Sequence, residues 1–425
     1  MFGLYDIRGV YKKDFNEKDI QKIGNILSEI LGNAITVGRD TRIHSKEIEE
    51  YLIKGLRKKS IVIKAGIVTL PILVFWSIKR NVPSIMITAS HNPKEYNGLK
   101  IVKEDGTYFS PEDIKKLKEI FEKRDIIEEG NNHVYEMDTR KIYFDTIISK
   151  FKEYDFPVCF DFSNGSGFIL KELISEIFKR AVFINDYPDG NFPNHNPDPS
   201  KEENLKQLKE ICIKEKIKYG FCFDGDVDRI GIVYNGKKLD QEFITYLFAL
   251  AFCKNKDTVI LDIAQSYILD SLLNNLGIKV IRSRVGRVFL RPIAKKTKAR
   301  FFSEYSGHIG FKNFYYIDDG FYSSLMFLKA IEKVNIEEAK KEFPKIYKEY
   351  FEYRCIDKER KMEEIKKKAK NIFENIIEID GIDIRIKQGR ILIRKSNTEP
   401  LLRIYVEAEN KEKLKEYIDL AKKLL

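Results

Sequence analysis

Three aspartates stand at alternate positions in the segment FDGDVDR, directly after an apolar stretch. Alternate side chains of an extended segment point the same way, so Asp224, Asp226 and Asp228 could reach one point. Three carboxylates this close repel one another unless a cation lies among them, and no lysine stands inside the segment. Oxygen ligands in this number suit Mg²⁺ or Ca²⁺. The segment predicts a metal site, with an exposed acidic turn as the alternative, and Mg²⁺ would indicate phosphate chemistry.

An EF-hand calcium loop is the competing interpretation of this segment. Its sixth position must be glycine and its twelfth must be glutamate. Arg229 and Asn235 stand at those positions. The pattern therefore excludes an EF-hand.

A second polar loop, TASHNPKEYNGLK, places Ser90 beside His91. The serine does not stand in G-x-S-x-G, so the nucleophile elbow of a hydrolase is unsupported. The Asn-Gly pair further along predicts a turn that brings Lys100 back toward the loop. A purely structural serine is the alternative. In a chain with a predicted Mg²⁺ site, however, a serine, a histidine and a lysine on one loop favour a phosphorylated serine.

A third segment, SEYSGH, also follows a predicted strand. Glu304, Ser306 and His308 alternate there. Carboxylate and hydroxyl groups suit the hydroxyls of a sugar, and a histidine can exchange protons near neutral pH. A capped turn is an equally good interpretation of this segment alone.

A fourth segment, RKSNTEP, joins a predicted strand to a turn. It offers a guanidinium, hydroxyls, an amide and backbone N–H groups, from Arg394, Ser396, Asn397 and Thr398. The planar guanidinium matches phosphate in a bidentate geometry, so this segment predicts an anion site. An ordinary serine/threonine turn is the alternative.

Strand and helix patterns alternate through the first three quarters of the chain, and each motif follows a predicted strand. This alternation predicts α/β layers with largely parallel sheets. The predicted strands cover residues 61–66, 84–88, 158–162, 219–224, 229–234, 258–263, 279–284 and 300–304, and helices cover 71–80 and 167–180.

The last quarter has a different pattern, with three strands in quick succession between two helices. It predicts a small α+β domain with an antiparallel sheet. The helices cover 361–377 and 411–425, and the strands cover 382–386, 390–394 and 402–407. A long helical stretch over 335–370 is the predicted connector to this domain.

Composition is typical of a globular protein with several domains. The chain has 425 residues, of which 43% are hydrophobic and 12% aromatic, enough for three or four packed cores. The apolar run over 67–78 is too short to span a bilayer, and the N-terminal residues do not resemble an export signal. The five cysteines are scattered without a CxxC pair, which favours a reducing cytoplasm and no membrane partner.

The net charge of +11 raises the question of nucleic-acid binding. The lysines are mixed with glutamates, as in KLKEIFEKRDIIEEG, which is typical of a solvated helix surface. We therefore expect no nucleic-acid partner, and a small acidic substrate is the better interpretation of the charge.

Together, the four motifs give the chain a close resemblance to the α-D-phosphohexomutase family. TASHNP is similar to its phosphoserine loop, DGDVDR to its metal loop, SEYSGH to its sugar loop and RKSNTEP to its phosphate loop, in the family's order. The segments YDIRG, VGRDTR, NGLK and DGNFPNHNPDP agree with it as well. The YDIRG start, the threonine before ASHNP and the asparagine in SNTEP resemble the phosphomannomutase/phosphoglucomutase branch.

The resemblance implies a four-domain, heart-shaped architecture around a cleft. Three α/β domains with mixed sheets would cover residues 1–137, 138–238 and 239–345, and an α+β domain would cover 346–425. Each domain would supply one loop. The partner would be a small phosphosugar, and both a monomer and a homo-oligomer are compatible with the resemblance.

The resemblance also implies a reaction, the exchange of hexose 1-phosphate and hexose 6-phosphate through a phosphoserine and a hexose 1,6-bisphosphate, which is both intermediate and activator. One Mg²⁺ per chain would be held by Ser90, Asp224, Asp226 and Asp228. Catalytic roles fall on Ser90, Lys100, His308 and Arg8. Substrate-binding roles fall on Arg229, Arg284, Glu304, Ser306, Arg394, Ser396, Asn397, Thr398 and Arg403.

Three positions depart from the family pattern. Ser303 replaces a glycine before the sugar-loop glutamate, Tyr305 replaces a common methionine, and Arg390 replaces a frequent tryptophan. These differences concern the preference for glucose or mannose. They leave open a phosphoglucosamine mutase of the same family, and a sugar-phosphate-binding protein without turnover is the non-catalytic alternative.

Overall fold

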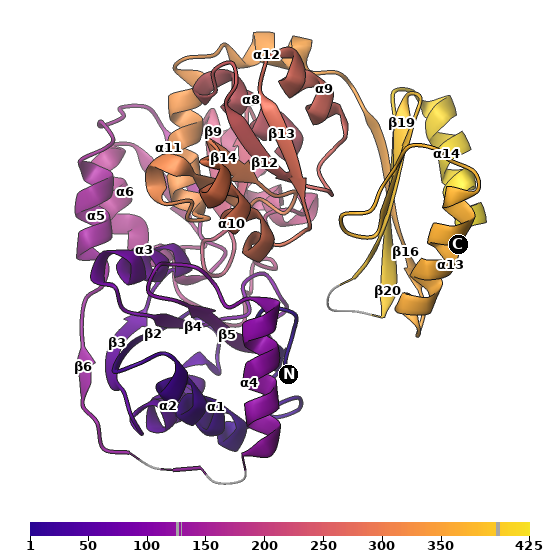
Figure 1. The fold of residues 1–425 in the computed structure, drawn as a ribbon. Helices are drawn as coiled ribbons and strands as arrows, with labels where there is room; N and C mark the ends of the chain where they lie inside the picture. Colours follow the sequence, from indigo (N-terminus) through magenta and orange to yellow (C-terminus); the bar gives the residue numbers. More distant parts are fainter. Residues whose placement is uncertain (125–126, 129, 397–399) are drawn as a thin grey trace. The chain divides into compact units, whose positions relative to one another are not determined.

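The computed structural model describes residues 1–124, 127–128, 130–396 and 400–425, and these form two units (Figure 1). The first unit comprises Met1–Leu239, Ser306–Gly310 and Ile317–Met326; the second comprises Asp240–Tyr305, Phe311–Tyr316 and Phe327–Leu425. The chain passes from the second unit to the first within the segment SEYSGH. Its glutamate therefore belongs to the second unit and its histidine to the first.

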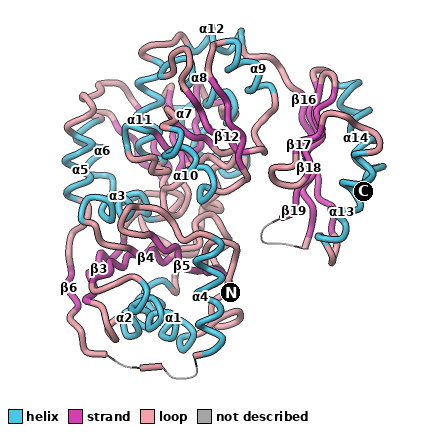
Figure 2. The backbone as a smooth tube through the Cα atoms, in the orientation of Figure 1, coloured by secondary structure: helices cyan, strands magenta, loops and turns pink. Residues whose placement is uncertain are grey.

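The first unit begins with a six-stranded mixed sheet of order β1-β5-β4-β2-β3-β6. Strands β4, β2, β3 and β6 are parallel, whereas β5 is antiparallel to both of its neighbours. Helices α1 and α2 lie on one face of the sheet and α3 on the other (Figure 2). The bounds are β1 Ile7–Val10, α1 Glu17–Ile30, β2 Ala34–Arg39, α2 Ser45–Leu56, β3 Ile61–Ile67, α3 Leu70–Arg80, β4 Ser84–Ile87, β5 Tyr96–Val102, α4 Pro111–Lys123 and β6 Val134–Glu136.

Local sequence explains two of these helices. Asn16 and Asp19 form a reciprocal capping box at the start of α1, each side chain accepting from the other's backbone N–H. Pro71 stands in the first turn of α3, where its missing N–H removes no helical hydrogen bond. The residues of α3 from Leu70 to Ser77 are all buried. The longest apolar run of the chain is therefore a core helix.

A second mixed sheet, of order β11-β10-β9-β7-β8, completes most of the first unit. Strands β9 and β10 are antiparallel and pair Phe223 with Ile230. The metal-loop aspartates consequently lie in the short connection between these two strands. The bounds are α5 Lys141–Ile148, β7 Val158–Asp161, η1 Ser166–Leu170, α6 Lys171–Ile177, β8 Ala181–Ile184, η2 Glu202–Leu205, α7 Lys206–Lys214, β9 Tyr219–Phe223, β10 Ile230–Tyr234 and β11 Lys237–Lys238.

The third sheet has the order β13-β12-β14-β15, with β12 parallel to β13 and to β14. The sugar-loop glutamate follows β14 directly. The bounds are α8 Gln241–Phe252, β12 Thr258–Asp262, α9 Ile268–Asn275, β13 Lys279–Ser283, α10 Arg287–Thr297, β14 Phe301–Ser303, β15 Ile309–Phe311, η3 Lys312–Phe314, α11 Gly320–Ile331 and α12 Ile336–Glu342.

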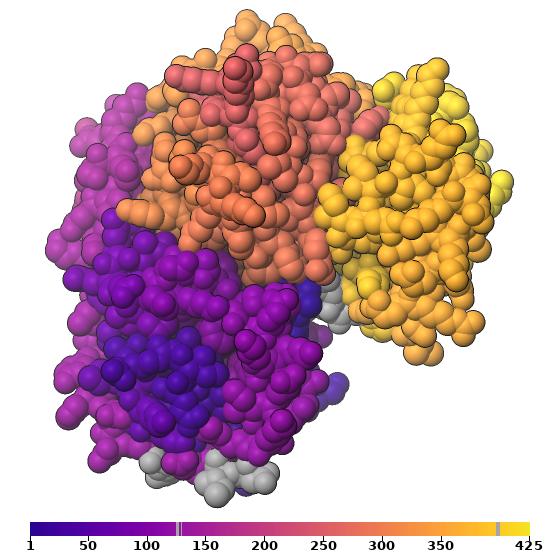
Figure 3. Space-filling view, in the orientation of Figure 1, coloured from indigo at the N-terminus to yellow at the C-terminus, as the bar shows by residue number. Residues whose placement is uncertain are grey.

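The C-terminal part of the second unit is an antiparallel sheet of order β16-β20-β19-β18-β17. Helices α13 and α14 pack on one of its faces (Figure 1), and these elements form one body, yellow to light orange in Figure 3. The bounds are β16 Tyr347–Arg354, α13 Lys358–Lys370, β17 Ile376–Ile377, β18 Ile382–Ile386, β19 Gly389–Lys395, β20 Leu401–Ala408 and α14 Lys411–Leu424.

The predicted fold class, three α/β domains with mixed sheets followed by an α+β domain, is confirmed. The long helical stretch predicted over 335–370 is wrong, because strand β16 lies in its middle. Among the described strands it pairs with β20 alone, at the edge of the sheet, and most of its residues are exposed. Its segment YKEYFEYR therefore carries the charged residues of an edge strand, which look like a helix surface in sequence. The predicted helix over 361–377 ends early as α13, at Lys370.

Candidate active site

Ser90 lies at the end of β4 in a strained and buried loop. Its φ is 53°, a left-handed conformation that costs a residue other than glycine energy, and it is only 2% exposed. Its Oγ donates a hydrogen bond of 2.6 Å to Oδ2 of Asp224. Gly225 permits this approach, because a Cβ at that position would lie 2.7 Å from the carbonyl oxygen of Ser90.

Arg42 holds the serine loop in this conformation. Its buried guanidinium donates to four backbone carbonyls of the loop, those of Ser90 at 2.9 Å, Asn92 at 2.6 Å, Pro93 at 2.7 Å and Tyr96 at 3.0 Å. Asp40 lies 3.2 Å from its Nε. This arginine ends the segment VGRDTR, and the sequence alone assigned it no role.

The three aspartates of the metal loop are fully buried. One oxygen of each lies within 4.8 Å of the others. Burial and then repulsion by Asp228 and Asp226 raise the pKa of Asp224 well above its usual range. Val227, inside the same loop, has a φ of 66°, which is unusual for a β-branched residue. The loop therefore concentrates negative charge in a strained and water-poor place.

Lys100 supplies positive charge to this cluster. Its Nζ donates to Oδ2 of Asp226 at 2.6 Å and to Oδ2 of Asp228 at 2.7 Å. Oδ1 of Asp226 is buried and accepts no hydrogen bond from any residue that the structure describes. A hard divalent cation would satisfy that oxygen and offset the remaining charge. These residues thus fit a metal ion, and the three aspartates would hold it.

His308, from the far end of the sugar loop, joins the aspartates. Arg229 donates from Nε to His308 Nε2 at 3.1 Å, so this nitrogen is the acceptor. Nδ1 then carries the proton and lies 3.0 Å from the carbonyl oxygen of Asp228 and 3.2 Å from Oδ2 of Asp318. The hydrogen bonds consequently select one neutral tautomer. Sequence reasoning missed Asp318, which has no motif around it.

His91 and Arg8 border the serine. Burial, together with the charges of Arg229, Arg8 and Lys100, holds the pKa of His91 well below its usual range, so this imidazole is neutral near pH 7. Its Nδ1 lies 3.4 Å from Ser90 Oγ. Arg8 donates to Oδ1 of Asn92 at 2.8 Å and to Oδ2 of Asp6 at 2.6 Å. The first unit thus gathers Ser90, Lys100, the three aspartates, Arg229, His308 and Arg8.

The sugar-loop glutamate of the second unit is also buried. Oε2 of Glu304 accepts from the backbone N–H of Gly286 at 3.0 Å. Burial and then the charge of Glu304 raise the pKa of Asp262 to about 7. The backbone N–H of Tyr305 donates to this Asp262 at 3.2 Å. Ser306, by contrast, belongs to the first unit.

Arg394, on β19, is 3% exposed and paired with Asp380. Its Nε and Nη2 donate to one oxygen of that carboxylate at 3.1 and 2.9 Å. The same oxygen accepts from the backbone N–H of Val285 at 3.2 Å, next to the Gly286 amide that binds Glu304. Glu304 and Asp380, the carboxylate partner of Arg394, therefore accept from adjacent backbone amides.

The other predicted residues are placed as follows. Arg403 lies opposite Arg394 on β20, and Ser396 is buried with its carbonyl bonded to Lys358 at 2.7 Å. Arg284 stacks on the ring of Phe289, 4.4 Å from its centroid. Asn397 and Thr398 lie outside the described residues.

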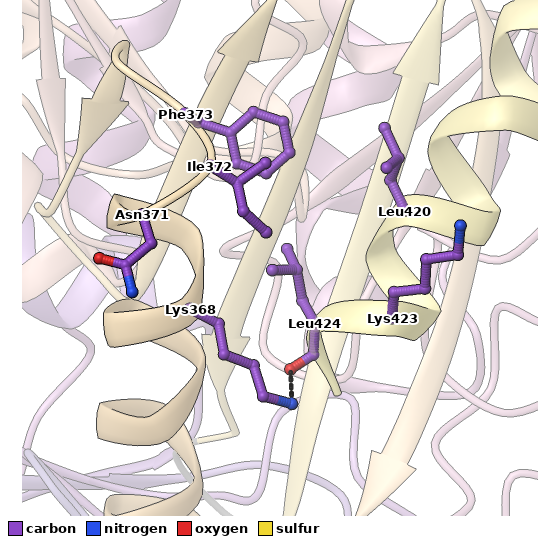
Figure 4. Close-up of a pocket in the computed structure, with 7 residues that line it drawn as sticks. All are labelled: Lys368, Asn371, Ile372, Phe373, Leu420, Lys423 and Leu424. Carbon is purple, nitrogen blue, oxygen red and sulfur yellow. Dashed lines mark hydrogen bonds between the residues drawn. The ribbon is translucent and has the colours of Figure 1, made fainter.

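A cavity of about 280 Å³ lies elsewhere, between α13 and α14 (Figure 4). Its wall is mostly apolar, and Lys368 and Lys423 stand at its rim (Figure 4). It contains none of the predicted site residues. In the part of the chain that the structure describes, every helix is too short or too polar to cross a membrane.

Comparison with known protein families identifies matches along nearly the whole chain. The descriptions are "Phosphoglucomutase/phosphomannomutase, alpha/beta/alpha domain I" for residues 1–127, domain II for 139–237, domain III for 240–352 and the C-terminal domain for 333–423.

Individual relatives agree with these matches. A phosphomannomutase of Methanocaldococcus jannaschii is 35% identical, over 100% of this chain and 97% of its own length. A probable phosphoglucosamine mutase of Methanococcoides burtonii is 32% identical, over 96% and 95%. The crystal structure of a phosphoglucomutase/phosphomannomutase family protein of Burkholderia thailandensis has a TM-score of 0.89 and 26% identity, over 100% of this chain and 96% of that one. This chain belongs to the phosphoglucomutase/phosphomannomutase family, within the α-D-phosphohexomutases.

Proposed function

We propose that this chain is a phosphohexomutase that interconverts the 1-phosphate and 6-phosphate of mannose, of glucose or of both. The observation that carries this proposal is the position of Ser90. Its hydroxyl, on a strained loop, is bonded to a buried carboxylate of a cluster that fits a metal ion. A serine that carries a phosphoryl group needs a cation beside it, and the aspartates supply the ligands for one.

The reaction starts from Ser90 in its phosphorylated form. A free hydroxyl of the hexose monophosphate attacks the phosphorus, the bond from phosphorus to Ser90 Oγ breaks, and a hexose 1,6-bisphosphate forms. The proton of the sugar hydroxyl ends on Ser90 Oγ, which restores the hydroxyl that donates to Asp224. After the bisphosphate has turned end over end, its other phosphoryl group returns to Ser90. One Mg²⁺ per chain, bound at the aspartates, would supply positive charge to the transferring group.

The charged groups around Ser90 have separate tasks in this scheme. Lys100 neutralises two of the aspartates and stabilises charge on the phosphoryl group, and Arg8 holds the loop through Asn92 and adds positive charge. His308, whose neutral tautomer is set by Arg229, takes part in proton transfer. Contacts of 2.6–3.1 Å among these groups support the proposed assignments.

The substrate is a phosphosugar bound through its hydroxyls and its non-reacting phosphate. We propose that Glu304 and Ser306 bind the sugar hydroxyls. The non-reacting phosphate is assigned to Arg394, Ser396, Asn397, Thr398 and Arg403, with Arg229 and Arg284 as further contacts. Arg394 would exchange Asp380 for phosphate, a substitution between two anions that suits its planar guanidinium.

A phosphoglucosamine mutase is the second candidate, because a relative with that name is 32% identical. The test is kcat/KM for mannose 1-phosphate, glucose 1-phosphate and glucosamine 1-phosphate, measured side by side with glucose 1,6-bisphosphate as activator. We expect mannose 1-phosphate or glucose 1-phosphate to be preferred. Preference for glucosamine 1-phosphate would establish the second candidate, and no turnover of any of the three would leave a sugar-phosphate-binding protein.

A further inference from the structure

Gln265 is a fully buried residue that joins several parts of the second unit. It follows β12 and begins the approach to α9. Its Nε2 donates to the carbonyl oxygen of Ser303 at 2.6 Å, and its Oε1 accepts from Thr245 at 2.9 Å. Its own carbonyl oxygen accepts from Arg282 at 2.9 Å and from Arg390 at 3.0 Å. One side chain and one carbonyl thus connect β13, β14, α8 and β19.

On one side, this network holds the sugar loop. Ser303, the residue before Glu304, has its carbonyl bound by Gln265, and its Oγ is bound by Gln241 at 3.0 Å and by Thr245 at 2.8 Å. A glycine at position 303 could not make the two Oγ contacts. On the other side of Glu304, the backbone of Tyr305 is bonded to Asp262. Both neighbours of the glutamate are therefore held by the segment that contains Gln265.

On its other side, the network reaches the C-terminal sheet. Arg390, on β19, is fully buried and donates to the carbonyls of Ile263 at 2.8 Å, Ala264 at 3.3 Å and Gln265 at 3.0 Å. Its Nη2 also donates to Glu407 at 2.7 Å, and Ser266 donates to the same carboxylate at 2.6 Å. Arg390 therefore attaches the sheet to the residues before α9.

The same strand carries Arg394, four residues further along. Residues of even spacing on a strand face the same side, and β19 is hydrogen-bonded on both sides, to β18 and to β20. The distance between Arg390 and Arg394 is therefore set by a rigid element. A buried arginine with its carboxylate seldom adds stability over apolar residues of the same shape, so stability alone does not account for a charge at this position.

We propose that Gln265 and Arg390 are positioning residues, which hold the sugar-binding Glu304 at a fixed place relative to the phosphate-binding Arg394. Together they set the distance from the sugar hydroxyls to the non-reacting phosphate that the second unit accepts. This inference rests on the proposed roles of Glu304 and Arg394 in binding substrate. It gives a task to Ser303 and Arg390, two of the three departures from the family pattern, because both are bonded to Gln265.

The test is direct binding of glucose 1-phosphate by isothermal titration calorimetry, which needs no turnover. In Gln265→Leu, which keeps the volume but cannot donate to Ser303, we expect Kd to rise about tenfold or more. Arg390→Met should give a similar rise. The matched control is Arg385→Met, which removes the ion pairs of this β18 residue with Asp270 on α9 at 3.0 Å and with Asp383 at 2.8 Å, but removes no hydrogen bond to residues 263–266. It should bind within twofold of the original protein.

Inorganic phosphate is the second probe. Its Kd should change less than twofold in Gln265→Leu, because Arg394 and its loop remain intact. Unchanged glucose 1-phosphate binding in Gln265→Leu, or an equal loss of both ligands, would overturn the proposal. If that variant does not fold, Gln241→Leu removes one donor to Ser303 and should weaken glucose 1-phosphate about threefold. If Gln241→Leu bound glucose 1-phosphate with the Kd of the unchanged protein, the proposal would also be overturned.

A mutase assay on the unchanged protein separates this inference from the proposed function. Absence of turnover there would count against the mutase while leaving the binding comparison valid. Normal turnover with unchanged Kd in the variants would count against the positioning roles alone.

Discussion

Two buried carboxylates in this molecule, Asp224 and Glu407, have pKa values that are shifted in opposite directions. Burial and the neighbouring aspartates raise the pKa of Asp224 well above its usual range. Burial also acts to raise the pKa of Glu407, but Arg390 and then Lys348 outweigh it and lower that pKa. Equal burial therefore gives different results, because one cluster has an excess of carboxylates and the other is matched by cations.

The backbone shows the same contrast. Around Asp224, both Ser90 and Val227 have positive φ, at 53° and 66°, and Oδ1 of Asp226 has no hydrogen bond from the described residues. Around Glu407, both carboxylate oxygens accept, from Arg390 and from Ser266. Backbone strain and unmatched charge thus coincide in the region to which we assign the chemistry, whereas the charges are matched in the region to which we assign a positioning role.

The largest effect should come from Ser90→Ala. We expect kcat to fall by about three orders of magnitude or more, because the group that carries the phosphate is gone. Intact mass should show one phosphate on the unchanged protein and none on the variant. Ser149→Ala, an exposed serine after α5, is the control and should keep both activity and phosphate. A Ser90→Ala protein of near-normal kcat would remove the basis of the proposed reaction.

Removal of the metal ion tests whether a cation offsets the excess negative charge of the aspartate cluster around Asp224. Chelation with EDTA should abolish turnover, and Mg²⁺ should restore it. Independently of activity, Mg²⁺ should raise the thermal unfolding midpoint, because a cation that binds only the folded state stabilises it. Asp226→Asn should lose this shift, whereas Asp145→Asn, an exposed aspartate on α5, should keep it. Full activity after exhaustive chelation would contradict the metal site.

Removing one charged partner from the cluster around Glu407 should lower the free energy of unfolding. Glu407→Gln removes the nearer of the two carboxylates beside Arg390, leaving Asp383 at 3.7 Å, and we expect the free energy of unfolding to fall by about 3 kcal/mol. The double variant Arg390→Met/Glu407→Leu should recover most of this loss. Glu416→Gln, in an exposed pair with Lys413, should change stability by less than about 1 kcal/mol. Urea denaturation measures all three, and a Glu407→Gln protein of unchanged stability would show that the two clusters do not differ as argued.

Arg394→Ala should affect binding rather than the phosphoryl step. We expect KM to rise roughly 10- to 100-fold for both the 1-phosphate and the 6-phosphate, from the loss of one charged hydrogen-bonding group. Release of free bisphosphate per turnover should increase, since the intermediate is held less tightly. If only one direction of the reaction were affected, a phosphate grip common to both orientations would be wrong. A lower unfolding midpoint with unchanged KM would assign Arg394 to the fold alone.

The smallest expected effect concerns His195, outside both clusters. Its Nε2 lies 3.0 Å from Oδ2 of Asp161 and its Nδ1 lies 2.9 Å from the carbonyl oxygen of Asn196. Burial lowers the pKa of His195, but the bond to Asp161 outweighs it, so the folded-state pKa is raised. A raised pKa means that the contribution is complete below the unfolded pKa of about 6.5 and is lost as pH rises through the folded value.

We therefore expect the contribution of this group to the free energy of unfolding to decrease as pH rises from 6 to 9. Asp262 and Asp319, whose pKa values burial raises to about 7, change stability in the same direction. The measurement is accordingly the difference between the unchanged protein and His195→Gln across pH. A constant difference would show that His195 does not titrate in this window.

Much of the site could be predicted because its parts are local. The three aspartates alternate over five residues, and the glycine that lets Asp224 approach Ser90 stands among them. The strands before each motif are short β-prone runs, and most were found within a residue or two of their bounds. Strand β16 was missed, because an edge strand with exposed lysines and glutamates has the composition of a helix surface.

The sequence by itself determined the motifs, their order, the fold class and the membership of the family, because these depend on residue type at fixed short spacing. Only the tertiary structure decided which charges meet. No lysine stands within the metal loop, yet Lys100 reaches it from another strand, 126 residues away from Asp226. Arg42 donates to the serine loop, whose Ser90 is 48 residues away in the sequence. Arg390 donates to Glu407 and to the carbonyls of residues 263–265. Such pairings depend on chain topology, which places residues side by side without any trace in their local spacing.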